Sequence, residues 1–280
     1  MIRVVLVVLL AGMGFLHASP ASAQWTQGKA GRVWVKSALF WQRTGQEFDA
    51  VGNRRERIDQ GTSNSRAIFT DVIVGLHPQL DLWLQIPYLD LAFSSPAQDL
   101  RSRGFGDVRA WLRWQPVRLG ASTPLALRVG AKAPLGFSPL DVTIVPLGEG
   151  QWDLEVFGEV GHSFWPAPVY AELWAGYRAR FANATTIKDP GGEYVFLLEG
   201  GVNLSTRILL KATLDGFAGR NWIVEGVETS SSRSILSLQL GGGVKVVGPV
   251  WVEAGGRYPL AGRTFPAGPQ LVLGLSGRLR

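Results

Sequence analysis

Alternation of apolar and polar residues with a period of two is the feature that most limits how this chain can fold. In LALRVGAKAP, residues 125–134, five apolar side chains fall on one side of an extended chain, while Arg128 and Lys132 fall on the other. WDLEVFGEVGHSF, residues 152–164, alternates in the same way with acidic residues. Such alternation predicts β-strands with one apolar and one polar face. Convincing helical periodicity is absent after residue 23, so the sequence predicts an all-β fold.

Twelve segments share this pattern, and most are longer than the usual strand of about 5–6 residues. They fit the 9–11 residues that a tilted strand needs to cross a bilayer. The segments are 32–42, 65–76, 82–93, 106–115, 124–135, 151–164, 168–182, 192–204, 207–217, 232–247, 249–259 and 269–280.

The connections between these segments alternate in length. Short ones contain HPQLD, WPAP, STR and VGPV, whereas long ones cover residues 43–64, 94–104, 136–150 and 219–231. Alternating short turns and long loops are typical of an outer-membrane barrel, with its periplasmic turns and extracellular loops. An even number of strands also returns the C-terminus to the periplasmic side.

A soluble sandwich or a lipocalin-like barrel would show the same alternation. Twelve strands, however, would leave the interior of a soluble barrel too wide for side chains alone to fill. Aromatic residues on the apolar faces also gather near strand ends, as in the two girdles of a lipid-facing barrel. These residues are Trp41, Trp152, Phe181, Tyr194 and Tyr258 near the loops, and Trp114 and Phe164 near the turns. The sequence therefore predicts a transmembrane antiparallel up-and-down β-barrel of about twelve strands over residues 24–280.

Residues 1–23 have the features of a secretory signal peptide. A positive start is followed by the apolar run VVLVVLLAGMGFL and by Ala21-Ser22-Ala23, an A-x-A cleavage site. No later run of 18 apolar residues exists, and the chain has no cysteine, which excludes disulfides and thiolate metal sites. We therefore expect export to the outer membrane of a Gram-negative bacterium.

The charge of the chain gives little support to a nucleic-acid partner. The net charge is +6, and the basic residues are spread along the chain without a block. Only 18% of residues are charged, below the roughly 25% of a typical soluble domain. The expected partners are membrane lipid and lipopolysaccharide, a small solute, and the barrel-assembly machinery during biogenesis.

The stretch GFGDVRAWLRWQP, residues 104–116, combines glycines, arginines and tryptophans. No helix follows its glycines to aim backbone amides at a phosphate, so a phosphate-binding loop is excluded. Its alternation places Asp107, Arg109, Trp111 and Arg113 on one face, which we assign to the barrel interior.

Charged residues on the inward parity are the candidate pore-lining residues. For any single residue we favour the interpretation that its charge pairs with an opposite charge on another strand, because buried charges are rarely left unpaired. As a group they could form opposed positive and negative walls that orient a polar solute. The candidates are Asp107, Arg109, Arg113, Arg128, Lys132, Asp153, Glu155, Glu159, Glu172, Trp174, Arg178 and Arg180.

Aromatic residues share the inward parity, either to contact an aromatic or amphipathic solute or to fill a narrow interior. They are Trp34, Phe40, Phe69, Trp83, Trp111, Phe157, Trp174 and Trp251. The apolar run Val142 to Leu147 is awkward for a solvated loop, and we expect it to fold into the barrel mouth as a constriction.

Enzymatic motifs are weak in this sequence. His77 lies in a short turn, and His162 lies on the apolar parity near the periplasmic end of its strand. Neither has the spacing of a metal site, and a lipid hydrolase would need a serine beside a histidine near the outer leaflet. We therefore expect no enzymatic activity, metal or cofactor.

Three motifs resemble an outer-membrane transporter family named for the meta-cleavage pathway of phenol degradation. A Gly-x-Gly-Asp strand start matches Gly104, Gly106 and Asp107; a strand ending in Lys-small-Pro-x-Gly matches residues 132–136; and Gly-x-Gly-x-x-Asp matches residues 148–153. The resemblance covers roughly residues 65–280, and it implies a channel without implying a substrate. One departure is the ending Gly277-Arg278-Leu279-Arg280, where such barrels usually end in an aromatic residue.

Together these observations predict an outer-membrane channel for passive uptake of small solutes, of aromatic or amphipathic character. The alternative is a closed structural barrel, or one whose long loops bind an outside partner.

Overall fold

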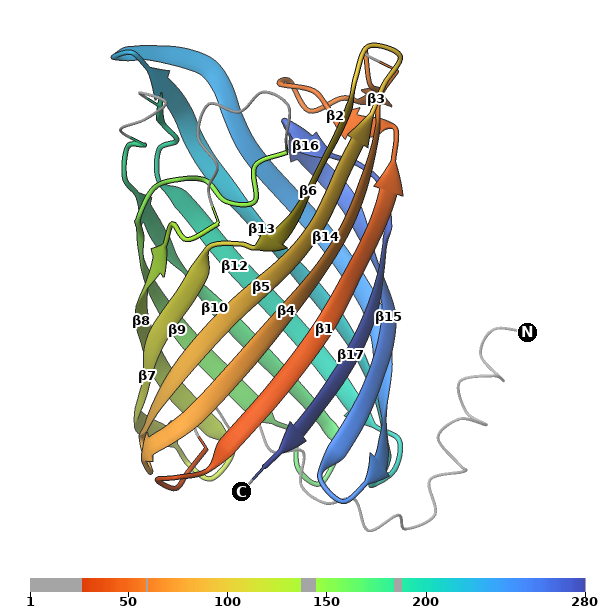
Figure 1. Cartoon of the computed structure of the whole chain (residues 1–280). Helices are drawn as coiled ribbons and strands as arrows, with labels where there is room; N and C mark the ends of the chain where they lie inside the picture. Colours follow the sequence, from red (N-terminus) through yellow and green to blue (C-terminus); the bar gives the residue numbers. More distant parts are fainter. Residues whose placement is uncertain (1–26, 59, 137–144, 184–187, 280) are drawn as a thin grey trace, which may run out of the picture.

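Twelve long strands close into one antiparallel barrel in the computed structural model, which describes residues 27–58, 60–136, 145–183 and 188–279 (Figure 1). Each strand pairs with its neighbours along the chain, and β1 pairs with β17 to close the wall. The barrel strands are β1 (Val33–Thr44), β4 (Thr62–His77), β5 (Leu80–Ser94), β7 (Val108–Leu119), β8 (Thr123–Ala133), β9 (Asp153–Ser163), β10 (Val169–Arg180), β12 (Glu193–Asn203), β13 (Ile208–Val224), β14 (Val227–Val247), β15 (Val250–Arg263) and β17 (Gln270–Arg278).

The predicted fold class is confirmed, because each of the twelve expected segments corresponds to one barrel strand. Within the described part of the chain, no helix is long and apolar enough to cross a bilayer. The expected signal peptide, residues 1–23, lies outside the described residues.

Alternation along each strand separates a lipid-facing surface from the interior. On β9, for example, Leu154 and Val156 are exposed, whereas Asp153 and Glu155 are buried. This is the reverse of a soluble protein, and it suits a wall whose outer side meets hydrocarbon. The aromatic residues expected at the girdles are all 42–67% exposed: Trp41, Trp114, Trp152, Phe164, Phe181, Tyr194 and Tyr258.

A small second sheet lies at the extracellular end, where we expected an irregular loop over residues 43–64. It joins β2 (Gln46–Phe48), β3 (Arg54–Glu56) and β16 (Phe265–Pro266) (Figure 1). Phe48 is buried in a cluster with Ile235 and Ala267, against which Phe217 and Phe265 pack. The first long connection is thus tied to the upper barrel by an apolar contact.

The expected long loop over residues 219–231 is wrong. β13 and β14 continue upward as a tall hairpin and meet in a two-residue turn, Glu225–Gly226 (Figure 1). Both turn residues have positive φ, 51° and 80°, as the hairpin turn that matches strand twist requires. Asn221, Ile223 and Val224 pair with residues of β14, so the ladder continues through the segment that we expected to be a loop.

At Gly106 the strand that pairs with β5 changes from β6 (Asp99–Phe105) to β7. β6, another strand in an expected loop, pairs with the upper part of β5, and β7 pairs with the lower part of β5 and with β8. Between them the Gly106 amide donates to the Pro87 carbonyl oxygen at 3.0 Å. Pro87 has no N–H to donate in return, so the ladder is interrupted at this level. The short β11 (Lys188–Asp189) pairs with the top of β13.

Gly130 gives the first testable prediction, because it lies directly opposite Trp111 on the inner wall. A Cβ at Gly130 would lie 2.2 Å from Trp111 Cδ1 and 2.3 Å from the Ala110 carbonyl oxygen. We expect Gly130→Ala to lower the free energy of unfolding by about 1–3 kcal/mol through overpacking. Guanidinium unfolding in phospholipid vesicles, followed by tryptophan fluorescence, measures this change.

Gly158→Ala is the matched control, since a Cβ there meets nothing within 4 Å. Equal unfolding midpoints for the two variants would contradict the assignment of Gly130 as a space required by the Trp111 ring.

Candidate functional site: the lumen and its ion pairs

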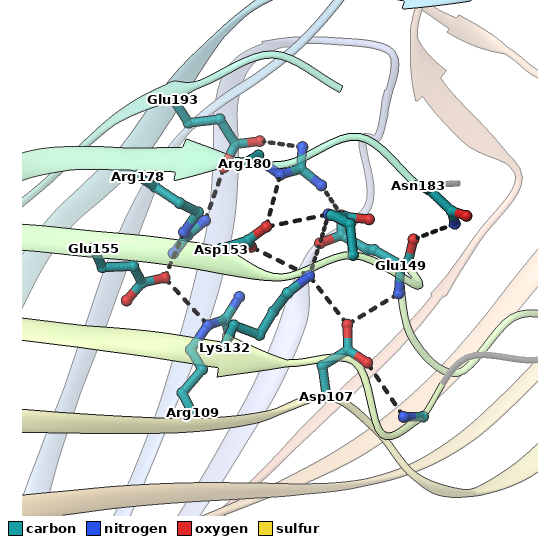
Figure 2. Close-up of polar contacts among 12 residues, drawn as sticks. Asp107, Arg109, Lys132, Glu149, Asp153, Glu155, Arg178, Arg180, Asn183 and Glu193 are labelled. Carbon is teal, nitrogen blue, oxygen red and sulfur yellow. Dashed lines mark hydrogen bonds and ion pairs between the residues drawn. The ribbon is translucent and has the colours of Figure 1, made fainter. Parts of the chain in front are cut away.

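Ten charged side chains gather inside the extracellular half of the barrel, and we call this group the upper ionic network. Figure 2 labels all of them except Arg233. Five are basic and five are acidic, so the network is neutral as a whole. Its members are Asp107, Arg109, Lys132, Glu149, Asp153, Glu155, Arg178, Arg180, Glu193 and Arg233.

Lys132 is the most buried cation of the upper ionic network, with 1% of its side chain exposed. Its Nζ lies 2.8 Å from Glu149, 3.1 Å from Asp107 and 3.2 Å from Asp153. Adjacent strands β8 and β9 place Lys132 directly opposite Asp153 in the ladder. The desolvated ammonium is therefore offset by three carboxylates.

Glu193 is the acidic counterpart, since its side chain is fully buried among three arginines. Its carboxylate accepts from Arg178 at 2.8 Å, from Arg180 at 2.9 Å and from Arg233 at 3.0 Å. The next carboxylate, Glu155, accepts from Arg178 and from Trp111 Nε1, both at 2.6 Å. Arginine forks supply several donors at once, which suits them to join strands in this way.

Glu149 links opposite parts of the barrel mouth. It lies between β8 and β9, yet its Oε1 is 2.6 Å from Arg180 and 2.8 Å from Arg233 on β14. The contact therefore joins this connection to a strand that is separated from β9 by β10, β12 and β13. Both this contact and the Phe48 cluster lie at the extracellular end of the barrel.

The three sequence motifs of the family resemblance meet in the upper ionic network. Asp107 accepts the backbone N–H of Gly136 at 3.2 Å and that of Glu149 at 3.0 Å, and it pairs with Lys132. One carboxylate thus holds both described ends of the β8–β9 connection. The glycines allow this approach, because a Cβ at Gly136 would lie 2.4 Å from the Gly106 Cα and one at Gly148 would lie 2.1 Å from Asp107 Oδ1.

A second buried group lies deeper in the barrel around Arg128. Its guanidinium pairs with Glu159 at 2.8 Å and lies within 4.7–5.4 Å of the centroids of four aromatic rings. Cation–π contacts of this kind are strongest when the cation is desolvated. The four rings belong to Trp83, Trp111, Phe157 and Trp174.

A cavity of about 800 Å³ occupies the interior beside this aromatic group. Among its aromatic lining residues are Trp34, Phe40, Phe69, Trp83 and Trp174. Its charged lining residues include Lys36, Asp71, Arg113, Glu159, Glu172, Glu199, Lys211, Asp215, Glu253 and Arg257. The wall therefore offers both aromatic surface and charge to anything inside it.

Most charges on the cavity wall are paired. Glu253 accepts from Lys36 at 3.0 Å and from Lys211 at 2.8 Å, and Arg257 pairs with Asp215. Glu199 accepts from Tyr170 at 2.7 Å and from Thr213 at 2.8 Å.

Glu172 differs from these groups, because it forms neither an ion pair nor a side-chain hydrogen bond with any residue that the structure describes. It lies on β10 directly opposite Glu199, with Trp174 two residues along the same strand. Asp71, on the far wall, accepts only from the neutral groups Trp83 Nε1 and Gln85 Nε2. Among the described residues, the cavity therefore holds two carboxylates that form no ion pair.

The twelve candidate residues divide by position. Asp107, Arg109, Lys132, Asp153, Glu155, Arg178 and Arg180 lie in the upper ionic network, and Arg128 lies in the aromatic group. Arg113, Glu159, Glu172 and Trp174 line the cavity. Instead of forming two opposed walls, the charged candidates are joined to one another in ion pairs, with Glu172 the exception in the described part of the chain.

Several charged residues of the lumen were not among the candidates predicted from the sequence. Glu149, Glu193 and Arg233 complete the upper ionic network, and Lys36, Lys211, Glu199 and Glu253 line the cavity. Extending the inward parity along β1, β12, β13, β14 and β15 would have found all of these except Glu149. Glu149 lies in a connection, where no alternation exists to place it.

Half of the expected constriction, Val142 to Leu147, falls on residues 142–144, which lie outside the described residues. Its described end lies at the mouth. Pro146 lines a small cavity with Arg180 and Arg233, and the Leu147 carbonyl oxygen lies 3.0 Å from the position of a Cβ at Gly106.

His77 and His162 lie at the turn end of the barrel. His162 Nδ1 is 2.7 Å from the hydroxyl of Thr123, and its ring packs on Phe164. His77 accepts a turn hydrogen bond from the Gln79 amide. Among the described residues, no group of three or more His, Cys, Asp or Glu side chains could hold a metal ion.

The sequence matches no protein-family model and no curated protein. Solved structures are similar in fold. An outer membrane channel from Pseudomonas putida F1 has a TM-score of 0.76 at 15% identity, covering 93% of this chain and 100% of that one. The translocator domain of the autotransporter NalP from Neisseria meningitidis has a TM-score of 0.53 at 11% identity, covering 90% of each chain.

A third similar structure is the β domain of the Bordetella autotransporter Brka, with a TM-score of 0.52 at 13% identity over 89% of this chain and 99% of that one. At these identities the likeness establishes the fold. The chain has the fold of a bacterial outer-membrane β-barrel.

Lys132 supplies the second prediction. Replacing it by methionine leaves three carboxylates together in the interior, and breaking a buried ion pair costs about 3–5 kcal/mol. We expect Lys132→Met to lower the free energy of unfolding in vesicles by about that amount, or to prevent folding altogether.

Lys29→Met is the control, because Lys29 is exposed and precedes the first strand. A Lys132→Met barrel as stable as this control would contradict the central place of Lys132 in the upper ionic network.

Proposed function

We propose that the protein is an outer-membrane channel through which small aromatic or amphipathic solutes pass passively. The observation that carries this proposal is the interior cavity of about 800 Å³, whose wall combines aromatic rings with charged groups. A cavity of this size can hold one small organic molecule. Rings offer flat apolar contact, and carboxylates beside them offer ionic contact with a polar end.

The similar fold of the Pseudomonas putida F1 outer membrane channel supports a channel role. We also propose membership of the family named for the meta-cleavage pathway of phenol degradation. Its support is that the three matching motifs meet around Asp107, where they form one structural unit.

A closed structural or surface-interaction barrel is the second candidate function. It is favoured by two contacts at the extracellular end, the ion pair between Glu149 and Arg233 and the apolar cluster around Phe48. A solute entering from outside would have to pass these contacts, so this candidate predicts no permeation.

Planar-bilayer recordings on the purified protein separate the two candidates. A channel gives discrete single-channel conductance, and liposomes containing it swell in solutions of small aromatic acids, aromatic amines or sugars at different rates. Absence of both conductance and swelling would reject the channel and support the closed barrel.

Glu172→Gln tests whether the cavity lies on the permeation path. In alkaline buffer the ionised Glu172 carboxylate adds a negative charge that forms no ion pair with a described residue, and a carboxylate in a pore favours cations. We expect the variant to be less cation-selective, with its reversal potential in a salt gradient displaced toward the chloride potential.

Glu225→Gln, in the exposed β13–β14 turn, makes the same charge change away from the lumen. An unmoved reversal potential in Glu172→Gln, or an equal displacement in both variants, would place the conduction path elsewhere.

A further inference from the structure

A patch of exposed arginines lies on the outer surface of the barrel, on three strands near their extracellular ends. We call it the arginine patch, and its members are Arg43 on β1, Arg66 on β4, and Arg101 and Arg103 on β6. The charged groups of the lumen lie on the opposite parity of these strands. The arginine patch therefore belongs to the surface that faces lipid and the outside medium.

The strand register brings these side chains together in two rows. In the lower row Trp41, Arg66, Asp90 and Arg103 are successive partners across β1, β4, β5 and β6. In the upper row Arg43, Asn64, Ala92 and Arg101 are partners in the same way. Neighbouring strands lie about 4.8 Å apart, so the backbone of Arg66 is about 10 Å from that of Arg103, and the backbone of Arg43 is about 14 Å from that of Arg101, all on one face of the wall.

The patch keeps a positive charge after its internal pairing. Asp90 binds Arg101 at 3.1 Å and Arg103 at 2.8 Å, yet these arginines remain 63% and 57% exposed. Asp99, farther up β6, lies on the same face. Four cations against two carboxylates leave a net charge of about +2, with donor groups of Arg101 and Arg103 still facing outward.

The level of the patch is set by the row of residues beneath it. Leu39, Ile68, Tyr88 and Phe105 are the next partners toward the periplasm on the same four strands. Tyr88 and Phe105 are in edge contact at 5.3 Å, and Trp41 stands beside Arg66. Aromatic residues of this kind mark the boundary between hydrocarbon and headgroups, so the arginines lie at headgroup height.

We propose that the arginine patch is a binding site for the phosphate groups of lipopolysaccharide in the outer leaflet. Guanidinium groups bind phosphate with paired hydrogen bonds, which favours arginine over lysine here. The acyl chains of the same glycolipid lie against Leu39, Ile68 and Phe105 below. The patch thus offers the two chemistries of this lipid in their natural order, and the site is independent of the lumen.

Binding of purified lipopolysaccharide to the detergent-solubilised full-length barrel tests the proposal. The informative variant is Arg43→Gln with Arg66→Gln, because neither arginine takes part in the Asp90 pairs. A basic side chain near an anionic lipid surface contributes about 1 kcal/mol, so losing two should weaken binding on the order of 30-fold.

Two exposed arginines elsewhere on the extracellular rim, Arg220 and Arg263, supply the control. Replacing both by glutamine removes the same charge, and we expect wild-type affinity. Equal weakening in the two double variants, or none in Arg43→Gln with Arg66→Gln, would overturn the site.

Two further measurements on the wild-type protein need no variant to fold. Lipopolysaccharide stripped of its phosphates should bind the wild-type protein more weakly than intact lipopolysaccharide does, and so should phosphatidylglycerol. Undiminished binding after phosphate removal, or equal binding of phosphatidylglycerol, would show that the patch does not recognise phosphorylated glycolipid.

Discussion

Backbone hydrogen bonding across a closed wall is the constraint on which the rest of this structure depends. In hydrocarbon an unpaired N–H or C=O group costs several kcal/mol, so a sheet can span a membrane only when its first and last strands meet. Here β1 pairs with β17 over nine residue pairs, from Trp34 with Arg278 to Gln42 with Gln270. The tall hairpin and the small upper sheet can vary because they lie beyond this requirement.

Closure of the barrel fixes which alternate residues of each strand face lipid and which face the interior. This orientation then determines where charged side chains can lie. Each strand must present its apolar residues to lipid, so its ionisable residues face a narrow interior. There they are desolvated, and the cost is offset only when opposite charges come together. Lys132 among three carboxylates and Glu193 among three arginines show this compensation.

Parity is also why so much of the fold could be predicted from the sequence. Long alternating strands show their two faces directly, so the twelve strands and their inward residues follow from local pattern. Pairing between inward residues depends on register and on connections, which local pattern does not contain. Glu149 illustrates the difference, because it lies between strands and meets Arg233 only after the barrel has closed.

Strand segments above the membrane were harder to predict than those within it. The residues on both sides of the Glu225–Gly226 turn pair as strands, although they do not continue the apolar and polar faces of a membrane-spanning wall. In β6, Arg101 and Arg103 lie on the exposed face, where a strand in hydrocarbon would carry apolar residues. The alternation that identifies a strand in hydrocarbon therefore does not identify one above it.

The three motifs gain a physical reason from their meeting point. Gly106 ends the pairing of β6, Asp107 then turns inward, and the connection after Lys132 passes close enough to be held by that carboxylate. Because one acid organises both a break in the wall and the connection beside it, losing any of the motifs would disturb the others. The residues that line the cavity below this junction do not hold the β8–β9 connection in place. Glu172 can therefore remain without an ion pair beside Trp174, where a solute in the cavity would meet both charge and an aromatic ring.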